Sequence, residues 1–147
     1  MGSGVERGTN LAIHERAVRR CVDYLRKRGQ RVSVQPRYAP WDFEVNDQCV
    51  AVRVGRPVRR TIRLRIRGKD YTYQYRLYHW NLHRHGRPLR GIDAVICVAK
   101  SGRAHVFFVI PWKAIHGLTF SVRDPETYHG HYARYLDNFA ALEKRAA

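Results

Sequence analysis

Two short stretches of this chain carry charged side chains at a spacing suited to phosphodiester chemistry. The first reads Trp-Asp-Phe-Glu-Val and contains Asp42 and Glu44. The second reads Val-Ala-Val-Arg-Val and contains Ala51 and Arg53. Alternation of apolar and polar residues predicts two β-strands, in which every second side chain points to the same face. We therefore expect Asp42 and Glu44 to share one face of the first strand, and Ala51 and Arg53 to share one face of the second.

These residue types match the needs of metal-assisted hydrolysis. Such a reaction requires oxygen ligands for Mg²⁺ or Mn²⁺, a cation near the developing negative charge and an activated water. Asp42 and Glu44 supply carboxylates, and Arg53 supplies a positive charge. Glu15 lies in the apolar stripe of a predicted helix, and its carboxylate would reach the same cleft if that helix packs over the sheet. The alternative for Glu15 is a carboxylate at the edge of the stripe that reaches water or pairs with an arginine.

The order of these pieces along the chain resembles a known pattern. A helix containing Glu15 is followed by Pro40-Trp41-Asp42 and then by Ala51-Val52-Arg53. This order resembles the PD-(D/E)xK nuclease superfamily, in which a helix with an embedded Glu precedes an Asp on the second strand and an acid-x-Lys motif on the third. The remainder resembles the branch that includes group I intron-associated homing endonucleases and junction-resolvase-like enzymes. The matching segments are Gly91-Ile92-Asp93-Ala94-Val95, Phe108-Val109-Ile110-Pro111 and Tyr135-Leu136-Asp137-Asn138-Phe139.

The resemblance implies a fold, an activity and a role for each matched residue. The fold is α/β, with a restriction-endonuclease-like mixed β-sheet flanked by N- and C-terminal helices. The activity is metal-dependent DNA cleavage by a homodimer or higher oligomer, because two strands must be cut. Asp42 would be the chief metal ligand, Glu15 would bind the metal or position its water, and Arg53 would occupy the Lys position. The metal ligands expected by this argument are Asp42, Glu15 and Glu44.

The chain departs from the superfamily at two positions. Arg53 is effectively always protonated, so it can stabilise charge but cannot accept a proton. Ala51 stands where the superfamily has Glu, Asp or Gln, and alanine cannot ligate a metal ion. Three explanations remain open: the acid has moved to Glu44, the chain is a natural nuclease-derived binder, or Ala51 is an introduced inactivating substitution. The sequence thus predicts a metal-dependent DNA endonuclease or, alternatively, a non-catalytic DNA- or RNA-binding protein derived from this fold.

The charge distribution points to a polyanionic partner. The net charge is +16 over 147 residues. Residues 53–90 hold twelve Lys and Arg side chains and a single acid, Asp70. A field of this kind attracts nucleic acid, and we expect double-stranded DNA, branched forms included. No apolar run is long enough to span a membrane, so a membrane partner is not expected.

Residue patterning predicts one domain over residues 1–147, with a basic β-hairpin arm. Alternation indicates a hairpin in which one face is strongly cationic, and like charges at alternate positions repel unless anions lie among them. The alternative is a solvated strand face. If the hairpin enters a major groove, its Arg and Gln side chains could read base edges. The expected nucleic-acid contacts are Arg56, Arg59, Arg60, Arg63, Arg65, Arg67, Arg76, Arg84 and Arg87.

The predicted elements place these residues along the chain. We expect helices over residues 10–28 and 127–145, a short helix from Pro111, hairpins over 41–54 and 58–79, and further strands over 31–35, 92–99, 105–110 and 119–122. Cys21, Cys49 and Cys97 form no CxxC pair and lie in apolar runs. We expect them to be reduced thiols in a cytoplasmic protein.

Overall fold

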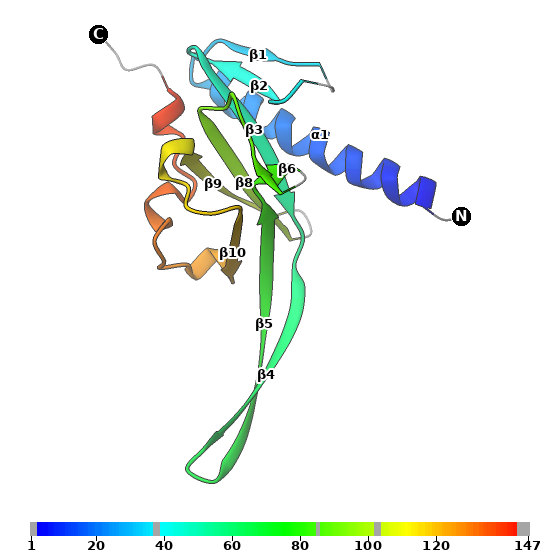
Figure 1. Cartoon of the computed structure of the whole chain (residues 1–147), viewed down its shortest axis with the longest axis vertical. Helices are drawn as coiled ribbons and strands as arrows, with labels where there is room; N and C mark the ends of the chain where they lie inside the picture. The colour runs from blue at the N-terminus through cyan, green and yellow to red at the C-terminus, as the bar shows by residue number, and fades with distance from the viewer. Residues whose placement is uncertain (1–2, 37–38, 85, 102–103, 144–147) are drawn as a thin grey trace.

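The computed structural model describes residues 3–36, 39–84, 86–101 and 104–143. Within them, one α-helix, α1 (Ser3–Lys27), packs against a five-stranded mixed sheet, and a long β-hairpin projects away from this body (Figure 1). The fold is therefore α/β with a mixed sheet, as the sequence predicted, and its sheets are open. No helix in the described part of the chain combines the length and the apolar composition needed to cross a membrane.

The five-stranded sheet has the order β1-β2-β3-β8-β9. Neighbouring strands are antiparallel except β3 and β8, which are parallel, and the chain leaves the sheet between these two. Asn46 and Asp47, both with positive φ, form the two-residue turn of the predicted first hairpin. The strands are β1 (Val32–Val34), β2 (Phe43–Val45), β3 (Gln48–Gly55), β8 (Ala94–Ser101) and β9 (Ala104–Pro111).

The projecting hairpin consists of β4 (Val58–Ile66) and β5 (Lys69–Asn81), joined by Arg67 and Gly68. These two turn residues have φ values of 52° and 78°, the left-handed pair that a tight hairpin turn requires. The end of β5 also pairs with β10 (Thr119–Arg123), which fastens the hairpin to the body. We call residues 58–77, where β4 and β5 pair, the arm; it extends well beyond the rest of the molecule (Figure 1).

Two apolar clusters form the core. The first lies between α1 and the sheet and includes Ala17, Cys21, Val50 and Val52. The second contains Ala51, together with Trp80 and the other aromatic side chains at the base of the hairpin. Because successive strand residues point to opposite faces, β3 contributes to both clusters in alternation. The sheet is thus covered on both faces, by α1 on one side and by the base of the hairpin on the other.

The predicted C-terminal helix over residues 127–145 is wrong. Up to residue 143, this region contains only short 3₁₀ turns, at Pro125–Thr127, Ala133–Tyr135 and Ala140–Leu142. Asp137 has a φ of 49°, which a right-handed helix cannot accommodate. Its carboxylate accepts a hydrogen bond from Phe107 N at 2.8 Å, and its own N–H donates to the Phe107 carbonyl. The segment therefore covers the open edge of β9, whose backbone groups need partners.

The remaining elements are short. A two-stranded ribbon, β6 (His83–Arg84) and β7 (Arg87–Pro88), follows the hairpin. The side chains of Arg84 and Arg87, two of the predicted nucleic-acid contacts, lie outside what the structure describes. The short helix expected after Pro111 is a single turn, Trp112–Ala114. The helix expected from residue 10 already begins at Ser3.

Candidate functional site

The candidate site lies where the edge of β3 becomes uncovered. β2 pairs with β3 only through residues 48–50, so the next backbone groups of β3 lack a strand partner on that side. Asp42, the residue before β2, fills part of this gap: its Oδ2 accepts a hydrogen bond of 2.6 Å from Val52 N. The backbone of Asp42 is held in turn, because its N–H donates to the Val50 carbonyl at 2.8 Å and its carbonyl accepts from Gln35 N at 2.9 Å.

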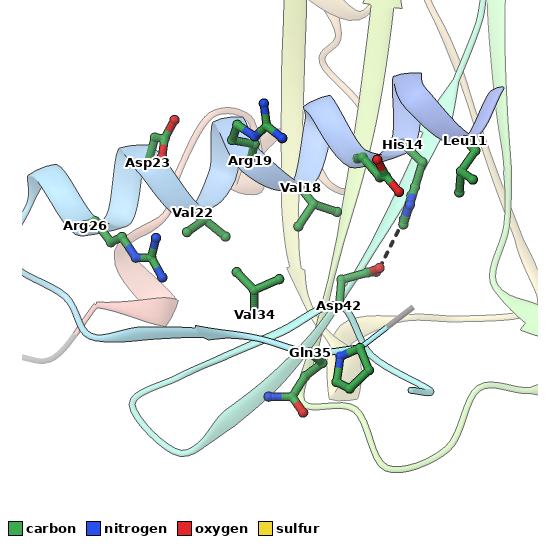
Figure 2. Close-up of a pocket in the computed structure, with 12 residues that line it drawn as sticks. Leu11, His14, Val18, Arg19, Val22, Asp23, Arg26, Val34, Gln35 and Asp42 are labelled. Carbon is green, nitrogen blue, oxygen red and sulfur yellow. Dashed lines mark ion pairs between the residues drawn. The ribbon is translucent and has the colours of Figure 1, made fainter. Parts of the chain in front are cut away.

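His14 completes the cover of this edge from the helix side. Its Nε2 lies 3.1 Å from Asp42 Oδ1 and 3.2 Å from the Val52 carbonyl oxygen. Both of these oxygens can only accept, so Nε2 must carry the proton and donate to them. His14 and Asp42 together satisfy the N–H and the C=O of Val52, as a neighbouring strand would do. Figure 2 shows the ion pair between the two side chains.

The same contacts change the acidity of His14. The hydrogen bond to Asp42 is the largest effect and raises the pKa of His14 above its ordinary value; the negative charge of Asp42 acts in the same direction. Burial and the positive charge of Arg53 oppose this rise. The side chain of His14 is 34 % exposed, so protons can exchange with solvent. The imidazolium form therefore persists to higher pH than in a free histidine.

Glu15 and Asp42 both line one cleft. The cleft has a volume of about 340 Å³ and lies between α1 and the segment that follows β1. Its apolar wall includes Val18, Val22 and Val34, and Asp42 points across it toward His14 (Figure 2). Glu15 is exposed and interacts with another group of the protein. Its carboxylate therefore lies at the rim of the cleft and not beneath the sheet.

Glu44 does not join Asp42. Its Oε1 accepts a hydrogen bond of 3.2 Å from Trp41 Nε1 and lies 3.8 Å from Cys49 Sγ. Both neighbours of Glu44 in β2 belong to the core cluster beneath α1, so Glu44 points to the opposite face. Asp42 precedes the paired part of the strand and turns toward His14. The expectation that Asp42 and Glu44 share one face therefore fails, because regular alternation ends where the strand pairing ends.

Ala51 and Arg53 lie two positions apart on β3 and share one face, as expected, but their surroundings differ. Ala51 is 1 % exposed and belongs to the core cluster on the face away from α1. Arg53 is half-buried and lies near enough to His14 to lower the pKa of the imidazole. It lines a hollow of about 330 Å³ together with His14 and Arg56. Of the predicted catalytic residues, Asp42 pairs with His14 and Arg53 lines a hollow beside His14, whereas Ala51 is directed into the core.

The residues present fit a divalent metal ion poorly. Both oxygens of Asp42 already accept hydrogen bonds from the protein, Ala51 has no ligand atom and Glu44 lies on the other face. Among the described residues, no three His, Cys, Asp or Glu side chains gather closely enough to bind one ion. The cluster of His14, Arg53 and Arg56 is cationic instead, and suits a phosphate group better than Mg²⁺.

The arm carries most of its charges on one face. Residues paired across antiparallel strands project to the same side, so the register of β4 and β5 assigns each side chain to a face. We call one side the cationic face; Arg59, Arg63 and Arg65 provide its charge, and all three are exposed. Asp70 lies 3.9 Å from Arg65 there, but both side chains are largely exposed, and such a pair is worth little. The cationic face comprises Arg59, Thr61, Arg63, Arg65, Asp70, Thr72, Gln74 and Arg76.

Three of the arginines that the sequence predicted as nucleic-acid contacts are placed differently from Arg59, Arg63 and Arg65. Arg60 pairs with Tyr75 and therefore points to the opposite face of the arm. Arg76 is on the cationic face but binds Glu126 at 2.6 Å and Asp124 at 3.4 Å, which fastens the arm to the body. Arg67 lies in the turn at the tip. Period-two alternation already places Arg60 on the side of Ile62 and Leu64, and its register with Tyr75 agrees with that placement.

His14 is the site residue that the sequence did not reveal. It precedes Glu15 by one position, and its partners Asp42 and Val52 lie 28 and 38 residues further along the chain. A histidine on a helix carries no local signal that it will cover a strand edge.

Comparison of the chain with protein-family models, curated proteins and solved structures finds no match.

Proposed function

We propose that this chain binds double-stranded DNA, branched forms included, through the cationic face of the arm. The observation that carries the proposal is the set of Arg59, Arg63 and Arg65 on one face of a projecting two-stranded ribbon. A ribbon of this width can enter the major groove of B-DNA. Guanidinium groups at alternate positions would contact phosphates, and such contacts position a protein on DNA without reading its sequence.

The hollow beside β3 supports the same proposal. Arg53, Arg56 and His14 line it, and Arg56 lies two residues before β4 begins. A phosphate backbone lying along the cationic face could therefore continue toward this hollow. The raised pKa of His14 adds positive charge there as the pH falls. Base readout would come from side chains such as Gln74, which projects from the cationic face.

A charge-removal variant tests the proposal. Changing Arg59, Arg63 and Arg65 together to Gln should weaken duplex binding and make it less sensitive to salt. The slope of log K against log salt concentration should become shallower by about 0.9 for each phosphate group that the variant no longer neutralises. Affinity for a labelled duplex would be measured by fluorescence anisotropy over a series of salt concentrations.

The control variant removes three exposed cations outside the arm. Arg31, Lys113 and Arg134 are all exposed, and changing them to Gln alters the net charge by the same amount. This variant should keep most of the salt slope of the original chain. An equal loss of affinity in both variants would mean that the overall charge, and not the arm, attracts DNA.

The second candidate is the Mg²⁺- or Mn²⁺-dependent endonuclease that the resemblance implies. The observation in its favour is that Glu15 and Asp42 line one cleft beside cationic residues. Supercoiled and branched DNA would be incubated with either metal and with the original chain or its Ala51→Glu and Ala51→Gln variants. Cleavage by any of these proteins would support the candidate, and a cutting enzyme would act as a homodimer or higher oligomer.

A reducing compartment such as the cytoplasm forms part of the proposal. The state of the cysteines is consistent with it. Cys21, Cys49 and Cys97 are free. Burial raises the pKa of Cys21 to about 12, so its reactive thiolate form is scarce at neutral pH. We therefore assign Cys21 to core packing and not to chemistry.

A further inference from the structure

The side of the arm opposite the cationic face has a different composition. On β5 it presents a row of three tyrosines, Tyr71, Tyr73 and Tyr75, and on β4 it presents aliphatic residues beside them. Pairing in register places Ile62 opposite Tyr73 and Leu64 opposite Tyr71. We call this side the tyrosine face; it comprises Val58, Arg60, Ile62, Leu64, Ile66, Lys69, Tyr71, Tyr73, Tyr75 and Leu77.

Large apolar side chains are exposed along this face. Tyr73 is 50 % exposed, Ile66 is 48 % exposed, Leu64 is 43 % exposed and Tyr71 is 39 % exposed. Isolated exposed apolar residues are ordinary on a protein surface, but a continuous row along a thin ribbon marks a binding surface. The cationic face of the arm carries only polar and charged side chains, so the apolar residues of the arm are gathered on the tyrosine face.

Cations flank the row of aromatic rings on the tyrosine face. The rings of Tyr71 and Tyr73 lie nearly parallel, at 12°, with centroids 6.3 Å apart. Arg123, from the neighbouring strand β10, lies over the ring of Tyr75 at 4.3 Å. Arg60 and Lys69 project from the same face. Rings available for stacking, with cations within reach of a phosphate backbone, are what proteins use to bind unpaired nucleotides.

We propose that the tyrosine face binds unpaired nucleotides, with Tyr71 and Tyr73 stacking on bases and with Arg60 and Lys69 contacting phosphates. This inference rests on the proposed function and specifies its substrate. One face of the arm would hold a duplex and the other would hold a displaced or unpaired strand. The preferred ligand is then a nucleic acid in which duplex and single strand meet, such as a fork or a junction.

A second copy of the chain fits this face less well. Each copy has a net charge of +16, and the tyrosine face itself carries Arg60 and Lys69. Packing two such faces together would bring like charges into contact while removing them from water. A polyanion with aromatic bases complements both the rings and the charges, whereas a second copy complements only the rings.

The test separates stacking from charge. Tyr71 and Tyr73 would be changed together to Ala, and in a matched control together to Phe, which keeps the rings. The probe is a labelled oligothymidylate of about 16 nucleotides, compared with a duplex of equal length. Affinity of the Ala variant for the oligothymidylate should fall about tenfold or more for each ring removed, while its duplex affinity stays close to that of the original chain. The Phe variant should bind both probes like the original chain.

Each other outcome has a defined meaning. If the original chain binds the duplex but not the oligothymidylate, this inference fails and the proposed function stands. If it binds neither probe, the proposed function fails as well. Unchanged oligothymidylate affinity in the Ala variant also overturns the inference. If, in addition, that variant alone changes from dimer to monomer in sedimentation, the tyrosine face is an interface between copies.

Discussion

His14 and Asp42 together replace part of a missing strand. Each contacts the backbone of Val52, and each also contacts the other. Because Asp42 is 21 % exposed and His14 is 34 % exposed, the pair is accessible to solvent and to a bound anion. The arrangement gives the carboxylate of Asp42 a structural role that involves no metal ion.

The first prediction concerns the titration of His14. Its pKa in the folded chain lies above the unfolded value of about 6.5, so the stability that the charged pair provides is fully present below that value and is lost as the pH rises through the folded pKa. Changing Asp42 to Asn should lower the pKa of His14 and flatten the dependence of unfolding free energy on pH in this window. The pKa would be followed by the NMR shifts of the imidazole.

Asp23→Asn provides the matched control for this titration. Asp23 is an exposed acid on the same helix and lines the same cleft, but its charge is not among the causes of the raised pKa. It should leave the titration of His14 nearly unchanged. A pKa of His14 at or below 6.5 in the original chain would contradict the proposed pairing.

The second prediction concerns Ala51. Its side chain lies in the apolar cluster away from α1, so a Glu there must bury a carboxylate among apolar groups. Ala51→Glu should lower the free energy of unfolding by about 2 kcal/mol or more, and should lower it more than Ala51→Val, which adds bulk without charge. Chemical denaturation of the three proteins measures these differences.

The opposite order of stability, with Ala51→Glu more stable than Ala51→Val, would change the interpretation of position 51. If Ala51→Glu is as stable as the original chain, its carboxylate has reached a polar environment. An introduced substitution would then explain Ala51 well. Cleavage of DNA by the same variant in Mg²⁺ would make the endonuclease the better candidate.

At the scale of elements, alternation predicted the strands and hairpins well. Residues 58–79 show the clear period of two that an exposed ribbon requires, and the turn at Gly68 marks its tip. The core strands β8 and β9 also follow from apolar runs of strand length. Local patterns suffice where the same contacts repeat along a strand.

Elements decided by distant contacts could not be predicted in this way. The aromatic residues after Tyr128 are spaced as on a helix, but Asp137 binds the backbone of Phe107 and the chain follows the edge of β9. The candidate site also depends on contacts between residues that are distant in the sequence. Its acids were visible in the sequence, but their grouping depends on where β2 stops pairing with β3, and no local pattern encodes that point.

The third prediction concerns the arm as a separable element. Removing residues 62–73 and joining Thr61 to Gln74 through Asn-Gly should leave the core intact, because Tyr78 and Trp80 at its base remain. The free energy of unfolding should change by about 1 kcal/mol or less. Affinity for duplex DNA should fall, because the deletion removes Arg63 and Arg65 from the cationic face. A collapse in stability would show that the arm also serves folding.

At the scale of the whole molecule, charge and shape act together. The body provides two covered sheet faces and a cationic hollow, and the arm extends from it as a ribbon with two chemically different sides. A net charge of +16 brings any polyanion to the surface. The arrangement of the arm then decides which part of the ligand meets arginines and which part meets tyrosines.

The most direct test of the central claim is to observe the arm arginines while DNA is added. The Nε–H signals of Arg59, Arg63 and Arg65 would be followed by NMR during titration with a duplex, with those of Arg31 and Arg134 as internal controls. We predict large shifts for the three arm arginines and small ones for the two controls. Equal shifts throughout, or shifts confined to residues outside the arm, would contradict the claim that the cationic face binds DNA.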